Sequence, residues 1–449
     1  MQPASGDQTE RGSPRHWMLV VALLIINTYA FIDRAVLALL VEPIKHDLGA
    51  TDLQMGLLLG LGFALFYAGF SIPAGHFVDL HGRRKIIGGA SILWALMTIV
   101  CGTSTTIGQL FLGRAGVGIA EAVIAPAAFS LIRDAVPLRS RGLAFSLYAM
   151  APLIGGASSL LIGGHVLAAA TAGAFEQLPL VGGLAPWQVT LILTGMLGLP
   201  LSALLLLAPE PARPPRSDDE LNRVGLLQGL SAALRHMREH LGTYVPLILF
   251  VTFGAMSNFA NSAWVPAILG RSWHVPPQQA GPMLGMIILP CGVIGLLFSG
   301  LVLNWLTARG GDIRNYGIIA ATGMVIGLVG FGLAPSLSFA LVMIGIASFF
   351  LGNSYSVGAT TLGQVTPVRL MGRVTAVYFL FQSLLGQALG PFLVAFGSQK
   401  IFTGPTALAS SFALWTGLFG IGMIIAAGIL RRRLRQGVTI TASSAAVAA

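Results

Sequence analysis

The stretch GHFVDLHGRRK, from Gly75 to Lys85, is a short charged interruption between two apolar windows, residues 53–78 and 86–106. Each window reaches the length of about 20 residues that a helix needs to cross a bilayer. The whole chain has 55% hydrophobic and only 9% charged residues, whereas a soluble domain carries roughly 25% charged residues. The stretch is therefore expected to be a loop between two transmembrane helices.

Apolar windows of similar length recur along the chain and predict an all-α membrane protein with twelve transmembrane helices. The windows are continuous and lack the period-two alternation of barrel strands, which favours helices. The expected helices are residues 17–41, 53–78, 86–106, 109–133, 142–168, 188–208, 243–269, 279–305, 315–334, 337–362, 372–398 and 405–430.

A long polar stretch, PEPARPPRSDDELNRVGLLQGLSAALRHMREH from Pro209 to His240, divides the twelve helices into six and six. Its Pro-rich front predicts an extended chain, and the part from Asp218 onward is compatible with an amphipathic cytoplasmic helix. A plain linker and a regulatory segment both fit this stretch. The expected parts are a cytoplasmic tail 1–16, a six-helix bundle 17–208, a cytoplasmic linker 209–242, a second six-helix bundle 243–431 and a cytoplasmic tail 432–449.

The formal net charge of +10 has a topological explanation and requires no nucleic-acid partner. Lysine and arginine concentrate in the cytoplasmic loops of membrane proteins. Outside the apolar windows, every basic residue except Lys45, Arg271 and Lys400 falls on the side that holds both ends of the chain. We therefore expect both termini to be cytoplasmic.

An internal sequence repeat supports a division into two related halves. The segment PLRSRGLAFSLY begins at Pro137 and PVRLMGRVTAVY begins at Pro367, each just before the fifth helix of its half. Proline, arginine, glycine and tyrosine recur in register at an offset of 230 residues. Parallel six-helix repeats with a substrate site between them are the plan of one large class of transporters.

The opening stretch places Gly75, Asp79, Gly82, Arg83, Arg84 and Lys85 in the spacing Gly-x-x-x-Asp-x-x-Gly-Arg-Arg-Lys. After the second of twelve helices, this pattern resembles the loop motif of the major facilitator superfamily, with Leu80 where relatives usually carry a basic residue. The resemblance implies the fold of that superfamily, two six-helix halves around a central substrate site.

Asp79 stands at a helix end, where it can pair with Arg139 or Arg141 of the next cytoplasmic loop. Such a pair forms only when the halves close on the cytoplasmic side, which predicts a gate. The predicted gating residues are Gly75, Asp79, Gly82, Arg83, Arg84, Arg139 and Arg141. The basic run from Arg83 to Lys85 fits a topological anchor equally well.

Four charged residues stand well inside apolar windows, away from the window edges: Asp33 and Arg34 in the first helix, Arg114 and Glu121 in the fourth. Charges within a bilayer are costly and usually mark substrate or proton paths. Seven residues are two helical turns, so Arg114 and Glu121 share one face, roughly 10 Å apart. We predict that Asp33, Arg114 and Glu121 couple protons to transport, because an anion on Arg114 would favour a proton on either acid. A neutral ion network without proton movement is the alternative.

The second half has polar and aromatic groups in its windows but no acid or base at mid-membrane. A cavity that is charged on one wall and apolar on the other suits an amphiphile. Asn258, Asn261 and Trp264 fall loosely on one side of the seventh helix. The predicted substrate-binding residues are Asn27, Arg34, Arg114, Asn258, Asn261, Trp264, Tyr378 and Gln382.

The first 165 or so residues also resemble the bacterial relatives of spinster transporters. The shared pattern is Asn27, Asp33 and Arg34 in helix 1, Phe66 and Tyr67 in helix 2, and RAGVGIAEA from Arg114 to Ala122, with Ala120 where relatives carry glycine. The resemblance implies a proton-coupled, monomeric transporter in the bacterial inner membrane, working by alternating access. Its cargo would be an amphipathic anion such as a lysophospholipid or a sphingosine-1-phosphate-like lipid.

Two other transport functions remain open, a proton symporter of small organic anions such as sugar acids and a multidrug efflux transporter. An enzyme is disfavoured, because no serine motif and no metal-ligand cluster is recognised and the histidines are scattered at loops and helix ends. Cys101 and Cys291 lie in apolar windows and fit neither a disulfide framework nor a metal site. We expect no cofactor and no metal.

Overall fold

The computed structural model describes residues 14–80, 82–179, 181–207, 226–367 and 370–435. These ranges fold into α-helices and form no strand. Within them, eleven helical segments are long and apolar enough to cross a membrane. The twelfth predicted segment is α10 (Pro186–Leu207), a 22-residue helix that packs along α5 (Arg83–Gly102). The predicted all-α membrane fold is confirmed.

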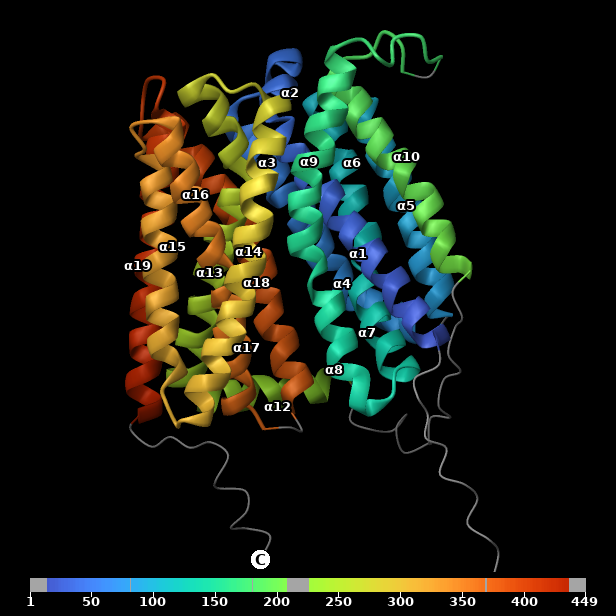
Figure 1. The fold of residues 1–449 in the computed structure, drawn as a ribbon. Helices are drawn as coiled ribbons and strands as arrows, with labels where there is room; N and C mark the ends of the chain where they lie inside the picture. Colours follow the sequence, from blue (N-terminus) through green and yellow to red (C-terminus); the bar gives the residue numbers. More distant parts are fainter. Residues whose placement is uncertain (1–13, 81, 180, 208–225, 368–369, 436–449) are drawn as a thin grey trace, which may run out of the picture.

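The helices form two halves that stand side by side (Figure 1). The first half contains α1 (Pro14–Leu39), α2 (Val41–Leu48), α3 (Asp52–Leu59), α4 (Leu61–Leu80), α5, α6 (Ile107–Glu121), α7 (Ile124–Ala135), α8 (Leu138–Ala149), α9 (Ala151–Thr171) and α10. The second half contains α13 (Leu241–Trp273), α14 (Pro277–Ala308), α15 (Ile313–Gly332), α16 (Leu337–Leu351), α17 (Asn353–Val365), α18 (Met371–Lys400) and α19 (Ala407–Arg435).

Two short helices mark the ends of the bundle. Helix α2 lies at the top of Figure 1, and α12 (Leu226–Glu239) lies across the bottom. We call these the α2 end and the α12 end; α1 begins and α19 ends at the α12 end. The helix predicted in the polar stretch is therefore present, although residues 208–225, which include Asp218, lie outside the described part of the chain.

Four predicted transmembrane segments are each divided by a short break, between α3 and α4, α6 and α7, α8 and α9, and α16 and α17. The break after α6 has a local cause, because Pro126 has no N–H to donate to the carbonyl of Ala122 four residues earlier. Helix α6 consequently ends at Glu121. The break thus places a carboxylate at a helix end inside the bundle.

Close helix contacts join the two halves at glycine residues, which have no side chain. A Cβ on Gly281 of α14 would lie 2.4 Å from the carbonyl oxygen of Leu160 on α9. A Cβ on Gly56 of α3 would lie 2.7 Å from Cβ of Ala395 on α18. Glycine at these positions lets the backbones approach as small residues do in other membrane helix pairs.

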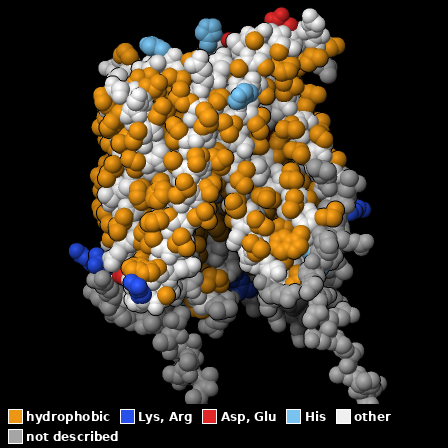
Figure 2. All heavy atoms as spheres, viewed as in Figure 1, with side chains coloured by type: hydrophobic (Ala, Val, Ile, Leu, Met, Phe, Trp, Pro, Cys, Tyr) orange, Lys and Arg blue, Asp and Glu red, His pale blue; other side chains and the backbone are white. Residues whose placement is uncertain are grey.

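The space-filling view shows that the halves meet at the α2 end and separate around a hollow at the α12 end (Figure 2). Apolar side chains cover the flank between the two ends, and the coloured charged groups of this face lie close to the ends. The protein is therefore closed at the α2 end and open at the α12 end.

Candidate functional site

Four buried charges on α1 and α6 meet in the first half and form two separate ion pairs. Nε of Arg34 donates to Oε2 of Glu121 at 2.6 Å, and Nη2 of Arg34 contacts the same oxygen. Nη1 of Arg114 donates to Oδ2 of Asp33 at 3.4 Å. We call these four residues the charge cluster. The two positive and two negative formal charges of the cluster cancel, so its net charge is zero.

Asp33 has a second donor on a third helix. Oγ1 of Thr98 on α5 donates to Oδ1 of Asp33 at 2.6 Å, so both carboxylate oxygens of Asp33 have partners. Asp33 is only 1% exposed and Arg114 only 4% exposed. This pair is therefore sealed between α1, α5 and α6, away from a solute.

The Arg34–Glu121 pair differs in its access to the surroundings. The side chain of Arg34 is 18% exposed, whereas that of Glu121 is 1% exposed. Within the described part of the chain, Oε1 of Glu121 has no hydrogen-bond partner. The side chain of Arg34 is thus the more exposed of the two arginines in the charge cluster, at 18% against 5% for Arg114.

Aromatic rings surround the Arg34 guanidinium. Its Cζ lies 4.8, 4.4 and 5.3 Å from the ring centroids of Phe31, Phe63 and Tyr67. Phe63 also lies 5.5 Å from Cζ of Arg114 and thus stands between the two arginines. Cation–π contacts of this kind stabilise the guanidinium groups in a site of low polarity.

The structure brings the predicted proton-coupling residues together with a different pairing. We expected Arg114 to serve both acids, but Glu121 pairs with Arg34 instead. The cause is helix geometry: Arg114 and Glu121 lie roughly 10 Å apart along α6, and neighbouring residues on α1 point about 100° apart. Asp33 and Arg34 therefore face different positions of α6. Whether these residues move protons stays a prediction.

The predicted substrate-binding residues of the second half fall into two groups. Trp264 is fully buried and donates to the carbonyl of Pro391 at 2.9 Å, which makes it a packing residue between α13 and α18. Tyr378 is also buried, at 2% exposed. These two side chains support the wall and do not face the hollow.

The second group is polar, with Asn258 and Gln382 half-buried and Asn261 buried at 6% exposed. Nδ2 of Asn258 donates to the Tyr355 hydroxyl at 3.3 Å, and Gln382 lies beside the same hydroxyl. Oδ1 of Asn261 has no partner within the described residues. Across the bundle, Asn27 of α1 donates to the carbonyl of Tyr148 at 3.3 Å. In the described part of α13–α19, charged residues stand only near helix ends, so this wall offers neutral polar groups.

At the α2 end, an ion network that we did not predict ties the halves together. Arg271 of α13 donates to Glu42 at 2.7 Å and to both carboxylate oxygens of Asp52, at 2.7 and 2.8 Å. Lys45 also pairs with Asp52, and the hydroxyl of Ser398 donates to Oδ2 of Asp52 at 3.1 Å. The sequence marked Lys45 and Arg271 only as basic residues on the side of the membrane opposite the two ends of the chain. The acidic partners of Arg271 are more than 200 positions away in the sequence and carry no local signal.

At the α12 end, the predicted gating residues are described only in part. Arg83 is 1% exposed and pairs with Asp134, and its Nη1 donates to the Ser130 hydroxyl at 2.9 Å. Nε of Arg141 donates to the Val136 carbonyl at 3.2 Å. Gly82 is the N-cap of α5, which begins with Arg83, Arg84 and Lys85.

Gly75 and Asp79 lie within α4. The structure describes neither the surroundings of these two residues nor the side chain of Arg139. The pairing of Asp79 with Arg139 or Arg141 therefore stays a prediction. Asp134, the partner of Arg83 in the last turn of α7, was not predicted, because an acid beside Arg133 just after an apolar window shows no distinctive pattern.

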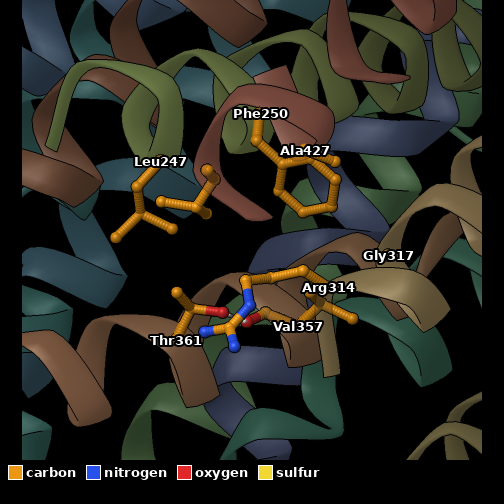
Figure 3. A pocket seen from close by; sticks show the side chains of 8 residues that line it. Leu247, Phe250, Arg314, Gly317, Val357, Thr361 and Ala427 are labelled. Atoms are coloured by element: carbon orange, nitrogen blue, oxygen red, sulfur yellow. Dashed lines mark hydrogen bonds between the residues drawn. The ribbon is translucent and has the colours of Figure 1, made fainter. Parts of the chain in front are cut away.

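A small pocket in the second half lies away from the charge cluster (Figure 3). Leu247, Phe250 and Ala427 line one side, and Val357, Thr361 and Arg314 line the other. These residues come from α13, α15, α17 and α19, within one half only.

The sequences of known proteins that resemble this chain agree with the observed fold. The family profile described as Major Facilitator Superfamily matches residues 23–391. An "MFS-type efflux pump" of Mycolicibacterium smegmatis is 27% identical over 413 residues, which are 88% of this chain and 87% of that protein. A "D-galactonate transporter" of Escherichia coli is 26% identical over 407 residues, or 86% of this chain and 90% of that protein.

Among solved structures, a bacterial homologue of the human lysosomal transporter Spinster superposes with a TM-score of 0.80. It is 24% identical in sequence, and the match covers 93% of this chain and 96% of that one. That structure is in an inward-facing and unoccupied conformation. The similarity establishes a shared fold.

Proposed function

Because the chain belongs to the Major Facilitator Superfamily, whose members are membrane transporters and not enzymes, we propose that it moves an amphipathic organic anion by proton-coupled alternating access. The observation that carries the proposal is the Arg34–Glu121 pair, in which a partly exposed cation holds a buried acid. A lysophospholipid or a sphingosine-1-phosphate-like lipid has the required combination of anionic head and apolar tail.

The pair supplies a direct means of coupling. An anionic head that binds the guanidinium of Arg34 competes with the carboxylate of Glu121 for the same donors. Once displaced, Glu121 is a buried acid without a counter-charge, and burial of this kind favours the protonated form. Anion binding and proton uptake therefore promote each other, and the linkage is reciprocal. Arg34 replaces Arg114 as the first contact for the anion in this mechanism.

The second pair has a separate place in the cycle. Asp33 is held by Thr98 and Arg114 and is sealed from the hollow in the present conformation. A carboxylate in that position can exchange a proton only when α1, α5 and α6 rearrange. We propose that Asp33 is the acid that titrates in the conformation open at the other end.

The opposite wall suits the remainder of an amphiphile. It offers the neutral groups of Asn258, Asn261, Tyr355 and Gln382, and charged residues of the described second half stay near helix ends. An apolar or weakly polar tail can lie there without burying a charge. The first half would bind the head and the second half the tail.

Alternating access requires the closed end to open. The pairs of Arg271 with Glu42 and Asp52 join the two halves and must separate for an outward-open state to form. We propose that the α2 end faces away from the cytoplasm, in agreement with the distribution of basic residues. The termini would then be cytoplasmic, and the chain a monomer in the bacterial inner membrane.

The relatives favour one second candidate, proton symport of a small sugar acid. A D-galactonate transporter matches 86% of this chain, and a hydrophilic carboxylate could bind Arg34 in the same way. The similarity to an efflux pump, over 88% of the chain, agrees better with an amphipathic cargo. The distinction depends on whether the cargo needs an apolar tail.

The test uses purified protein in liposomes that contain a pH-sensitive dye. A lysophospholipid, sphingosine-1-phosphate, D-galactonate and an amphipathic antibiotic are added separately, with empty liposomes as the control for leakage. Proton flux with the lipids and not with D-galactonate is the expected result. Flux with D-galactonate alone would replace the proposal by sugar-acid symport, and flux with the antibiotic alone by drug transport. No flux in any arm, with folded protein, would contradict proton coupling.

A further inference from the structure

Three potential metal ligands meet where α12 joins α13. The segment HMREH places His236, Glu239 and His240 at positions i, i+3 and i+4, which lie on one face of a helix. One ligand atom from each side chain lies within 4.8 Å of the other two. No metal-ligand cluster was expected from the sequence, and the spacing in HMREH is a candidate that this expectation missed.

The neighbouring groups hold the two imidazoles in place. Nδ1 of His240 donates to the carbonyl of His236 at 2.9 Å, which leaves Nε2 of His240 as the atom with a lone pair. The rings of His236 and His240 are tilted by 41° with their centroids 4.5 Å apart, and the rings of His236 and Tyr244 form a T-shaped contact at 5.7 Å. The hydroxyl of Tyr244 lies 3.1 Å from that of Thr366. Supports of this kind orient metal ligands in known sites.

Two imidazoles and one carboxylate form a donor set with a marked preference. Zn²⁺ is bound by His nitrogen and by Asp or Glu oxygen in sites with three protein ligands. Divalent ions late in the first transition row bind such nitrogen ligands well, whereas Mg²⁺ prefers oxygen. The donor set therefore selects Zn²⁺ or a similar ion over Mg²⁺.

The surrounding charges allow a cation to approach. Arg235 and Arg238 belong to the same helix and are both exposed. Arg235 lies four positions before Glu239 and shares its face, whereas Arg238 projects from another face than His236. Arg433 of α19 approaches Gly242, at 3.4 Å from an ideal Cβ position, and it is also exposed. Water screens these guanidinium groups, and Glu239 contributes a negative charge directly to the site.

We propose that His236, Glu239 and His240 bind one Zn²⁺ ion and thereby fix the junction between α12 and α13. His240 is the N-cap residue of α13, and α12 packs on α18 through its buried Ala233 and Met237. An ion held by both helices restricts the angle between the linker and the second half. This inference concerns a site outside the hollow and does not depend on the proposed cargo.

The test is a Zn²⁺ titration of the full-length protein after removal of any histidine tag, in competition with a chromophoric chelator. Wild-type protein is expected to bind one equivalent of Zn²⁺, and excess Mg²⁺ is expected not to displace it. His240→Ala and Glu239→Gln should each weaken binding by at least about tenfold, since even outer-shell partners of a metal are worth 10 to 100-fold. Glu239 is exposed, so its replacement leaves the fold intact.

His46→Ala and His165→Ala are the matched controls, because both histidines are exposed and lie far from α12 in the sequence. They should bind Zn²⁺ as the wild type does. Hydrogen exchange of the amides in residues 231–245 should slow when Zn²⁺ is added to the wild type and should not change in Glu239→Gln. Equal affinity in the wild type and both site variants, or loss of binding in a control variant, would overturn the proposal.

Discussion

Arg34 of α1 and Glu121 of α6 form an ion pair in which the arginine Nε donates to Oε2 at 2.6 Å, although Arg114 lies on the same helix as the glutamate. The arrangement gives each acid of the charge cluster its own arginine. A solute that reaches Arg34 therefore perturbs Glu121 first and leaves the Asp33–Arg114 pair in place.

Removing one member of this pair should cost more stability than removing both. Arg34→Met leaves the Glu121 carboxylate buried without a partner, and breaking a buried pair costs about 3–5 kcal/mol. Arg34→Met combined with Glu121→Leu removes both charges and should recover most of the loss of thermal stability. Melting curves of the purified single and double variants measure the difference. A loss in the double variant equal to the sum of the losses in Arg34→Met and Glu121→Leu alone would mean that the two side chains do not interact.

Thr98 should hold Asp33 without being required for coupling. Thr98→Val removes the hydroxyl that donates at 2.6 Å to Oδ1, and hydrogen bonds to charged groups are worth about 1.5–3 kcal/mol. We expect a lower melting temperature and retained proton-coupled transport. Thr194→Val is the matched control, because its hydroxyl bonds only within its own helix. Abolished transport in Thr98→Val, with normal expression, would assign Thr98 a direct role.

Arg271 should keep the α2 end closed. Arg271→Gln removes the cation that joins Glu42 and Asp52 to the second half, so the equilibrium should shift toward the conformation open at this end. Spin labels on His46→Cys and Thr403→Cys, with Cys101 and Cys291 replaced by Ser, report the separation of the halves. We expect Arg271→Gln to increase the population of molecules in which the two spin labels are far apart.

Lys400→Gln is the control for that experiment. Lys400 is an exposed basic residue at the same end for which no ion pair is found in the described residues, and its replacement should leave the distance distribution unchanged. An unchanged distribution in Arg271→Gln, or an equal shift in Lys400→Gln, would contradict a specific role for the Arg271 network.

The contact of α9 with α14 should depend on the absence of a side chain at position 281. A Cβ at Gly281 would lie 2.4 Å from the Leu160 carbonyl oxygen, so Gly281→Ala must push the helices apart. At Gly300 of the same helix a Cβ would meet nothing within 4 Å. We expect Gly281→Ala to lower the melting temperature and Gly300→Ala to leave it nearly unchanged. Identical melting temperatures would show that the interface adapts.

The fold was largely predictable because bilayer thickness limits helix length, and composition reveals the spans directly. The four charges of the candidate site were predictable for a related reason, since Asp33 and Glu121 are conspicuous in apolar windows. Their pairing was not, because the choice between Arg34 and Arg114 depends on the rotation of α1 against α6. Sequence spacing defines the face within one helix and gives no information on its partner.

The missed residues share another feature: each acts through a partner that is remote in sequence or through an unremarkable pattern. Arg271 and Asp52 are 219 positions apart, and neither stands in an unusual context. Trp264 was predicted to contact substrate because it falls on one side of the seventh helix with Asn258 and Asn261, but its ring fills the contact of α13 with α18. Burial of that kind follows from helix packing and cannot be read from one helix alone.

The most direct measurement of proton coupling compares Asp33→Asn, Glu121→Gln and Glu176→Gln in liposomes. Glu176 is an exposed acid outside the charge cluster and serves as the control. With the cargo that drives proton flux in the wild type, we expect Glu176→Gln to retain that flux. Asp33→Asn and Glu121→Gln should lose it, although both should still exchange labelled cargo across the membrane without a gradient. Undiminished proton flux in both site variants would show that the protons take another path and would contradict the coupling role of the charge cluster.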